Sequence, residues 1–195
     1  MSRYRYPHTI DNGAGERLTF VRRVAGRTGD RLEVVNAIDP GVGPPMHVHY
    51  RQEESLTVVA GRMGYQRDGE APRFAGPGET VTFARGEAHR FWNAGDGELR
   101  CAGHIEPADN IEYFLTELFA STRRSGRSRP DPFDAAYLSR RYRSEVAITK
   151  VPAPVQRLTF PAVVFVGRLL GRYARYADAP APARPQPAAR RGRTR

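Results

Sequence analysis

Short stretches in which apolar and polar residues alternate dominate the first 108 residues. Within residues 30–39, every second side chain falls on one side of the expected strand, namely Leu32, Val34, Asn36 and Ile38. A period of two is typical of strands with one buried face. The pattern predicts strands over 17–24, 30–39, 54–61, 79–86, 89–93 and 98–106, with glycine-rich and proline-rich turns between them. Many short strands at close spacing predict an all-β sandwich or barrel.

The pattern changes after Pro107, where apolar residues recur every three or four positions, as on the buried face of a helix. Helices are therefore expected over 109–126, 131–146 and 158–176. The chain divides into a predicted barrel over 1–108 and a helical extension over 109–175. We expect the extension to pack on the barrel or on a partner subunit, since exposed apolar helix faces usually mark contacts.

The charge is strongly positive and unevenly distributed. The 195 residues have a formal net charge of +10, and 30 of the 31 basic residues are arginine. Residues 176–195 hold five of these arginines and one aspartate, mostly among alanine and proline. Such a segment lacks the apolar side chains needed for folding, so a disordered basic tail is predicted. No specific nucleic-acid partner is expected, because no recognised binding motif accompanies the arginines. Association with nucleic acid or an anionic membrane surface through the arginines is the alternative.

A single cysteine, Cys101, excludes an intramolecular disulfide and a cysteine-based zinc site. No apolar run approaches the roughly 20 residues that span a bilayer, so no transmembrane segment is expected. The first residues also lack the apolar stretch of a secretory signal. A cytoplasmic location is therefore the expectation.

The chemically informative residues are histidines. His47 and His49 are two residues apart, and on a strand such side chains share one face, so both imidazoles can reach one point. Two carboxylates, Glu53 and Glu54, follow closely. A pair of histidines beside a carboxylate is a metal-site pattern, although histidines with a purely structural role show it as well.

The surrounding spacing is more specific. The segment GVGPPMHVHYRQEESLTVVAG contains, at defined intervals, Gly41, His47, His49, Glu54 and Gly61. The segment GETVTFARGEAHRFWN contains Gly78, Gly86, His89 and Asn93. In this order the two segments resemble the two signature motifs of the cupin superfamily, and the resemblance covers residues 41–93. One departure is Ala84, which stands where the second motif usually has proline and which removes no ligand.

The resemblance implies a mainly β fold, a cupin jelly-roll β-barrel with C-terminal α-helices, and one divalent transition metal inside the barrel. The implied ligands are His47, His49, Glu54 and His89, with Glu53 as the rival carboxylate. Imidazole and carboxylate ligands suit Fe, Mn, Ni, Cu, Co or Zn, and the ligand set does not choose among them. The alternative is a metal-free barrel whose histidines only form hydrogen bonds.

Alternation along the strands also predicts the pocket walls. Leu56, Val58 and Phe91 share the inward side of the implied ligands and are candidate substrate-binding residues. His104 is a further candidate from outside the motifs, with a solvent-facing position as its alternative. Glu54 is a candidate catalytic base as well as a ligand. An apolar lining favours a hydrophobic small molecule.

The leading interpretation is a metal-dependent cupin enzyme that acts on a small organic molecule. A dioxygenase-like oxidoreductase is expected, and isomerase or cyclase chemistry is left open, because one fold hosts many reactions. The second interpretation is a non-catalytic cupin that binds a small molecule as a sensor. The resemblance also implies a homodimer.

Overall fold

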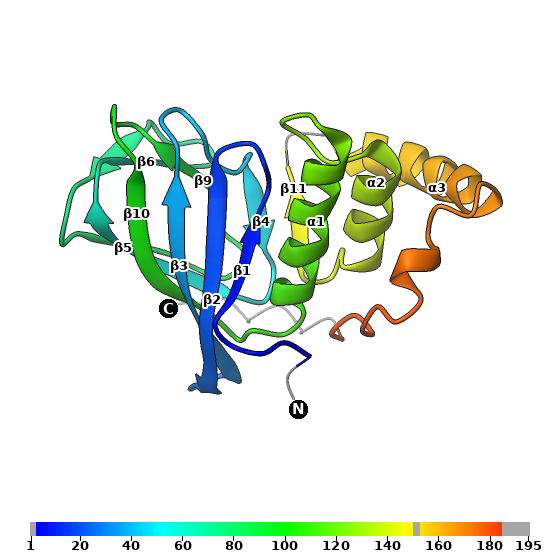
Figure 1. Ribbon diagram of the computed structural model, residues 1–195, viewed down its shortest axis with the longest axis horizontal. Coiled ribbons are helices and arrows are strands. Elements are labelled where there is room, and N and C mark those ends of the chain that lie inside the picture. The colour runs from blue at the N-terminus through cyan, green and yellow to red at the C-terminus, as the bar shows by residue number, and fades with distance from the viewer. Residues whose placement is uncertain (1–2, 150–152, 185–195) are drawn as a thin grey trace, which may run out of the picture.

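The computed structural model describes residues 3–149 and 153–184 (Figure 1). Its strands are β1 (His8–Asp11), β2 (Glu16–Ala25), β3 (Asp30–Ile38), β4 (His47–His49), β5 (Glu53–Ala60), β6 (Met63–Arg67), β7 (Arg73–Ala75), β8 (Thr80–Phe83), β9 (Ala88–Asn93), β10 (Leu99–Glu106) and β11 (Val146–Ile148). Its helices are α1 (Ile111–Ser125), α2 (Pro132–Arg141), α3 (Ala153–Leu169) and the short 3-10 helix η1 (Ala174–Tyr176).

Two antiparallel sheets make up the barrel and share one hydrophobic core. One sheet has the strand order β1-β2-β3-β10-β5-β8 and the other the order β11-β4-β9-β6-β7. The alternation predicted for β3 is confirmed, because Leu32, Val34 and Ile38 are buried while Val35 between them is exposed. The predicted fold class, a mainly β barrel followed by C-terminal helices, is confirmed.

The boundaries of two helices differ from the sequence-based expectation. Helix α2 ends at Arg141, and the last residue of the predicted helix, Val146, instead begins β11, which pairs with β4. This pairing depends on a partner a hundred residues away, which a local pattern does not contain. Helix α3 begins at residue 153, so Pro161 lies inside it and Pro154 occupies its first turn, where proline is well tolerated.

Helix α1 stands beside the barrel (Figure 1), and its apolar side chains line a cavity together with strands of both sheets. The helix ends at Gly126, whose φ of 63° is the left-handed conformation that glycine adopts easily. This C-terminal stop agrees with the sequence pattern. The helical extension thereby closes one side of the barrel interior.

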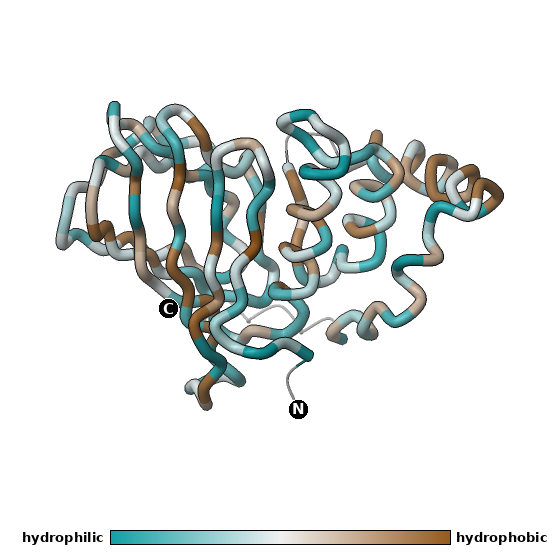
Figure 2. The backbone as a smooth tube through the Cα atoms, viewed as in Figure 1, coloured by the Kyte–Doolittle hydropathy of each residue, from teal (hydrophilic) through white to brown (hydrophobic). Residues whose placement is uncertain are grey.

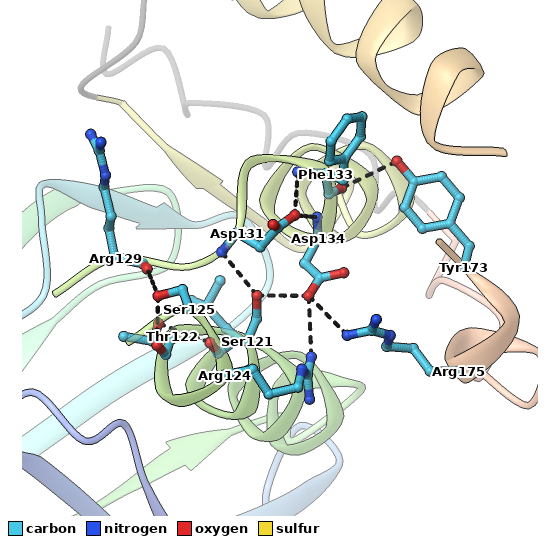
Figure 3. Close-up of polar contacts among 11 residues, drawn as sticks. Ser121, Thr122, Arg124, Ser125, Arg129, Asp131, Phe133, Asp134, Tyr173 and Arg175 are labelled. Carbon is cyan, nitrogen blue, oxygen red and sulfur yellow. Dashed lines mark hydrogen bonds and ion pairs between the residues drawn. The ribbon is translucent and has the colours of Figure 1, made fainter. Parts of the chain in front are cut away.

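A buried carboxylate joins the helices to one another (Figure 3). Asp134 is 3% exposed and accepts a hydrogen bond of 2.8 Å from the hydroxyl of Ser121 on α1. The same oxygen lies 3.1 Å from Arg124 Nη2 and 3.4 Å from Arg175 Nη1. One acidic side chain on α2 therefore connects α1 with the segment around η1.

The chain beyond η1 continues along α2. Arg141 donates to the carbonyl oxygens of Ala179 and Pro180 at 2.7 and 2.9 Å, and the Tyr142 hydroxyl donates to Pro180 at 3.0 Å. The Ala183 amide donates to the buried carboxylate of Glu145 at 2.8 Å. These contacts fall in the first part of the segment 176–195 for which a disordered tail is predicted, and residues 185–195 lie outside the described residues.

Helix α3 lies farthest from the barrel (Figure 1) and is rich in hydrophobic residues along its length (Figure 2). Three large side chains point into solvent, with exposures of 79% for Leu158, 62% for Phe165 and 73% for Leu169. In the described part of the chain, no helix combines the length and the apolar character needed to cross a membrane.

Candidate metal centre

Three histidines and one glutamate from both sheets converge inside the barrel. His47 and His49 lie two residues apart on β4, so both side chains are on its inner face. His89 on β9 pairs directly with His47 in the antiparallel register. Glu54 reaches the same point from β5 in the opposite sheet. The four side chains are buried, and each offers one ligand atom within 4.8 Å of the others. The structure thus brings together the four residues that the resemblance singled out.

The neighbouring carboxylate does not join this group. Glu53 precedes Glu54 on β5 and is half-buried, whereas Glu54 is 7% exposed. Since adjacent side chains of a strand point to opposite faces, only one of the two can reach the histidines. The carboxylate oxygen of Glu54 lies 3.0 Å from His89 Nε2 and 3.7 Å from His49 Nε2.

Backbone carbonyl groups orient two of the rings. His47 donates from Nδ1 to the carbonyl oxygen of Pro45 at 2.8 Å, and His89 donates from Nδ1 to that of Glu87 at 2.9 Å. The Nε2 atoms are then turned toward the centre, as in metal sites whose ligands are held by a second hydrogen bond. Phe83 stacks on His89 with ring centroids 3.9 Å apart. These contacts hold the rings in place before any ligand binds.

Burial sets the charge state of the group. Burial, together with the neighbouring imidazoles, lowers the pKa of His47 to about 4 and that of His49 to about 3. Burial alone would raise the pKa of Glu54, but the hydrogen bond from His89 and the surrounding histidines outweigh it and lower the pKa to about 2. At neutral pH the site therefore presents the neutral imidazoles of His47 and His49 beside an ionised carboxylate, the forms that bind metal ions.

The donor atoms fit a divalent transition metal. His49 Nε2 faces Glu54, and its buried Nδ1 has no hydrogen-bond partner among the described residues. Imidazole nitrogens and a carboxylate oxygen are ligands for Fe, Mn, Ni, Cu, Co and Zn alike. His47, His49, Glu54 and His89 could therefore hold one such ion, and the donor types leave its identity open.

An apolar cavity of about 200 Å³ opens directly onto this group. Leu56 and Phe91 line it, as expected from the alternation. Val58 is buried in the core but does not appear in the lining. His104 lies on the opposite face of β10 from the inward Cys101 and Ile105, is half-buried and does not line the cavity.

Several lining residues were not predicted. Helix α1 contributes Ile111, Phe114, Leu115, Leu118 and Phe119, and β11 contributes Val146 and Ile148. The helical period of α1 predicts which face of the helix is apolar, but it does not predict the surface against which that face packs. The polar lining residues Glu16 and Asn36 were also missed. Asn36 carried a signal, because it interrupts an otherwise apolar inward face of β3.

The sequence of the barrel decides its family. Residues 34–103 match the sequence profile of the family described as Cupin domain. This barrel is a cupin domain. The match includes all four converging residues, begins inside β3 and ends inside β10, so it covers the metal-ligand group and strands β4 to β9 but not β1, β2 or residues 109–184. No curated protein sequence matches the chain.

Solved structures similar to this cupin include three from bacteria. An uncharacterized conserved protein with a double-stranded beta-helix domain from Klebsiella pneumoniae is 20% identical, covering 54% of this chain and 82% of that one, with a TM-score of 0.41. KdgF from Halomonas sp. is 21% identical, covering 53% and 92%, with a TM-score of 0.44. A predicted oxalate decarboxylase from Thermotoga maritima is 20% identical, covering 51% and 90%, with a TM-score of 0.41.

Proposed function

We propose that this protein is a metal-dependent enzyme of the dioxygenase-like type that acts on a small organic molecule. The observation that carries the proposal is that three of the four candidate ligands, His47, His49 and Glu54, line an apolar cavity. A ligand group that served only the fold would not need a cavity beside it. Isomerase or cyclase chemistry at the same centre stays open within this proposal.

The chain's own residues define what the site can do. A divalent metal bound there would supply Lewis-acid polarisation of a substrate oxygen. Leu56, Phe91 and the apolar face of α1 exclude water and orient the substrate. Glu54 stays ionised as a ligand, and to take a substrate proton at Oε2 it must release the contact with His89 Nε2. Glu54 is thus the candidate base of the site.

Metal analysis tests the proposal directly. The full-length protein is analysed for transition metals after purification without a histidine tag and after reconstitution, beside His89→Ala. We expect near-stoichiometric metal in the wild type and a large loss in the variant, followed by oxygen consumption with phenolic or enolic substrates. No metal in the reconstituted wild type would overturn the proposal.

A non-catalytic sensor cupin is the second candidate function. It is favoured by one observation, the coverage of the cavity by α1, which suits retention of a ligand more than its rapid exchange. This candidate predicts stoichiometric ligand binding without turnover in the metal-loaded protein. The measurement that separates the two is product formation in a single-turnover experiment, because binding alone leaves the ligand unchanged.

The quaternary state proposed here is a homodimer in the cytoplasm. The exposed side chains of Leu158, Phe165 and Leu169 form a stripe on α3 at helical spacing, and pairing with a second copy would remove them from water. Sedimentation velocity of the wild type and of Phe165→Glu tests this interface. A monomeric wild type would contradict it. The buried free thiol of Cys101 is compatible with a reducing compartment.

A further inference from the structure

Two polar side chains interrupt the apolar lining of the cavity away from the metal-ligand group. Glu16 on β2 and Asn36 on β3 both line the cavity that also contains Glu54. Asn36 pairs with Cys101 in the register, whereas Glu54 pairs with Ile105 four residues farther along the same strand. The two groups therefore occupy separate positions along one cavity.

Asn36 is 3% exposed, and only one side of its amide has a partner. Its Nδ2 atom donates to Glu16 Oε1 at 3.1 Å. Its Oδ1 atom is buried and has no hydrogen-bond partner among the described residues. A buried acceptor without a donor is unfavourable, and such groups are rare unless a ligand or water completes them. The free atom belongs to a residue that lines the cavity, so a donor placed there would satisfy it.

Glu16 is a second polar group beside Asn36, and at low pH its carboxyl group is uncharged. Burial raises its pKa to about 7, with a smaller contribution from the charge of Glu54, while the hydrogen bond from Asn36 opposes the rise. Glu16 therefore presents a carboxyl group that is partly neutral near neutral pH. The amide of Asn36 holds one of its oxygens, and the other is available to a ligand.

The remaining lining limits the chemical class of the ligand. Although the chain has 30 arginines, neither arginine nor lysine is among the described residues that line this cavity. At the end of the cavity that holds Glu16 and Asn36, a phosphate or a second carboxylate would lie beside the acidic Glu16 with no basic side chain to pair with it. Buried anions require paired charges, so an anionic group at this end is unfavourable. The apolar residues that line the same cavity, such as Leu18, Val34 and Phe114, favour an uncharged and largely apolar molecule.

We propose that Glu16 and Asn36 form a subsite that recognises a hydroxyl group on an uncharged, largely apolar ligand. The hydroxyl donates to Asn36 Oδ1 or to the free oxygen of Glu16, and the apolar body lies under α1. This inference rests on the proposed function, because the reaction would take place at the other end of the ligand, at the metal-ligand group. Hydroxyl recognition itself needs no metal, so the two can fail separately.

Phenol and toluene are matched probes, because they differ in one hydroxyl against one methyl group. The cavity of about 200 Å³ suits a single ring, since a cavity of roughly 150 Å³ is known to hold benzene. A purely apolar cavity favours toluene, which leaves water more readily than phenol. In full-length protein, titration calorimetry is expected to show phenol binding at least ~10-fold more tightly than toluene.

Two variants locate the hydroxyl. Asn36→Leu keeps the branching of the side chain but removes the amide, and it should abolish the preference for phenol while retaining toluene binding. Val35→Thr, at the exposed neighbour of Asn36 on β3, is the matched control and should retain the preference. His89→Ala, with the metal site disrupted, should also retain it, so a failure of the metal proposal leaves this result intact.

Three outcomes would overturn the subsite. One is equal or tighter binding of toluene by the wild type, which needs no variant and holds even if Asn36→Leu fails to fold. Another is an Asn36→Leu protein that keeps the preference for phenol. The third is loss of the preference in His89→Ala together with its retention in Asn36→Leu, which would place hydroxyl recognition at the metal-ligand group instead.

Discussion

Phe83 and His89 stack face to face, with ring centroids 3.9 Å apart and planes inclined by only 5°. Phe83 comes from β8 in one sheet and His89 from β9 in the other, so the contact joins the two sheets at the metal-ligand group. Both residues are almost fully buried, at 1% exposure each. A histidine held between a stacked ring and a backbone carbonyl has little freedom to turn away from a metal ion.

Replacing Phe83 should therefore weaken metal binding without removing a ligand. We expect Phe83→Leu to reduce the affinity for zinc about 10-fold, the lower end of effects seen when ligand-supporting residues are lost. Competition with a chromogenic chelator measures the change. Phe91→Leu is the matched control, because it truncates another buried phenylalanine on the cavity wall that does not stack on a histidine. Equal zinc affinities in the two variants would contradict the role of the stacking.

The carboxyl group of Glu16 should make stability depend on pH. Its pKa of about 7 in the folded protein lies above the ordinary value of 4.5, because burial disfavours the charged form. The folded state then holds a proton that the unfolded state loses, so stability falls as pH rises from about 5 to above 7. The full loss is at most about 3 kcal/mol.

Urea denaturation at pH 5.5 and at pH 8 measures this dependence in the wild type and in Glu16→Gln. Other titrating groups contribute equally to both proteins, so the difference between them isolates Glu16. The variant should gain stability relative to the wild type at pH 8 and not at pH 5.5. A pH-independent difference between the two would show that Glu16 titrates normally.

The metal-ligand group could be predicted from the sequence, because the residues that identify it lie close together along the chain. His47 and His49 lie two residues apart on one strand, and the motif spacing around Glu54 and His89 is distinctive. The core positions of β3 were accessible for the same reason, since a period of two is written directly in the chain. The preference for Glu54 over Glu53 followed from this alternation as well.

The cavity was harder to predict from the sequence, because contacts between distant segments create it. Strand β11 pairs with β4, and nothing in residues 146–148 identifies that partner. The strands β1, β6 and β7 are short and were not predicted, since three to five residues barely establish a period. Of the predicted substrate residues, Leu56 and Phe91 line the cavity while Val58 and His104 do not, and the residues that α1 adds to the lining were not predicted.

The buried carboxylate of Asp134 should stabilise the packing of the helices (Figure 3). It accepts a hydrogen bond from Ser121 and faces Arg124 and Arg175, whose side chains are 43% and 39% exposed. Because these arginines can return to water, Asp134→Asn should lower the free energy of unfolding by about 1–2 kcal/mol, which is less than the loss of a fully buried ion pair would lower it. Ser121→Ala, which removes one hydrogen bond and no charge, should cost about 1 kcal/mol. Urea denaturation measures which of the two variants loses more free energy of unfolding. An Asp134→Asn variant that is as stable as the wild type would contradict the role of the charge.

The segment 177–184 should contribute to stability through its contacts with α2. A chain that ends at residue 176 loses the acceptors of Arg141 and Tyr142 and the amide that donates to Glu145. These are four hydrogen bonds, and each contributes about 1 kcal/mol, so their loss should lower the free energy of unfolding by about 4 kcal/mol. For a chain of this size we expect Tm to fall by about 8–16 °C.

A chain that ends at residue 184 is the matched control, because it retains every one of these contacts while most of the basic charge of residues 176–195 is removed. Differential scanning calorimetry should find its Tm close to that of the full chain. If the chain that ends at 176 melts at the same temperature as the full chain, the contacts of residues 177–184 do not stabilise the helices. If the chain that ends at 184 melts as low as the one that ends at 176, the loss must instead be assigned to residues 185–195.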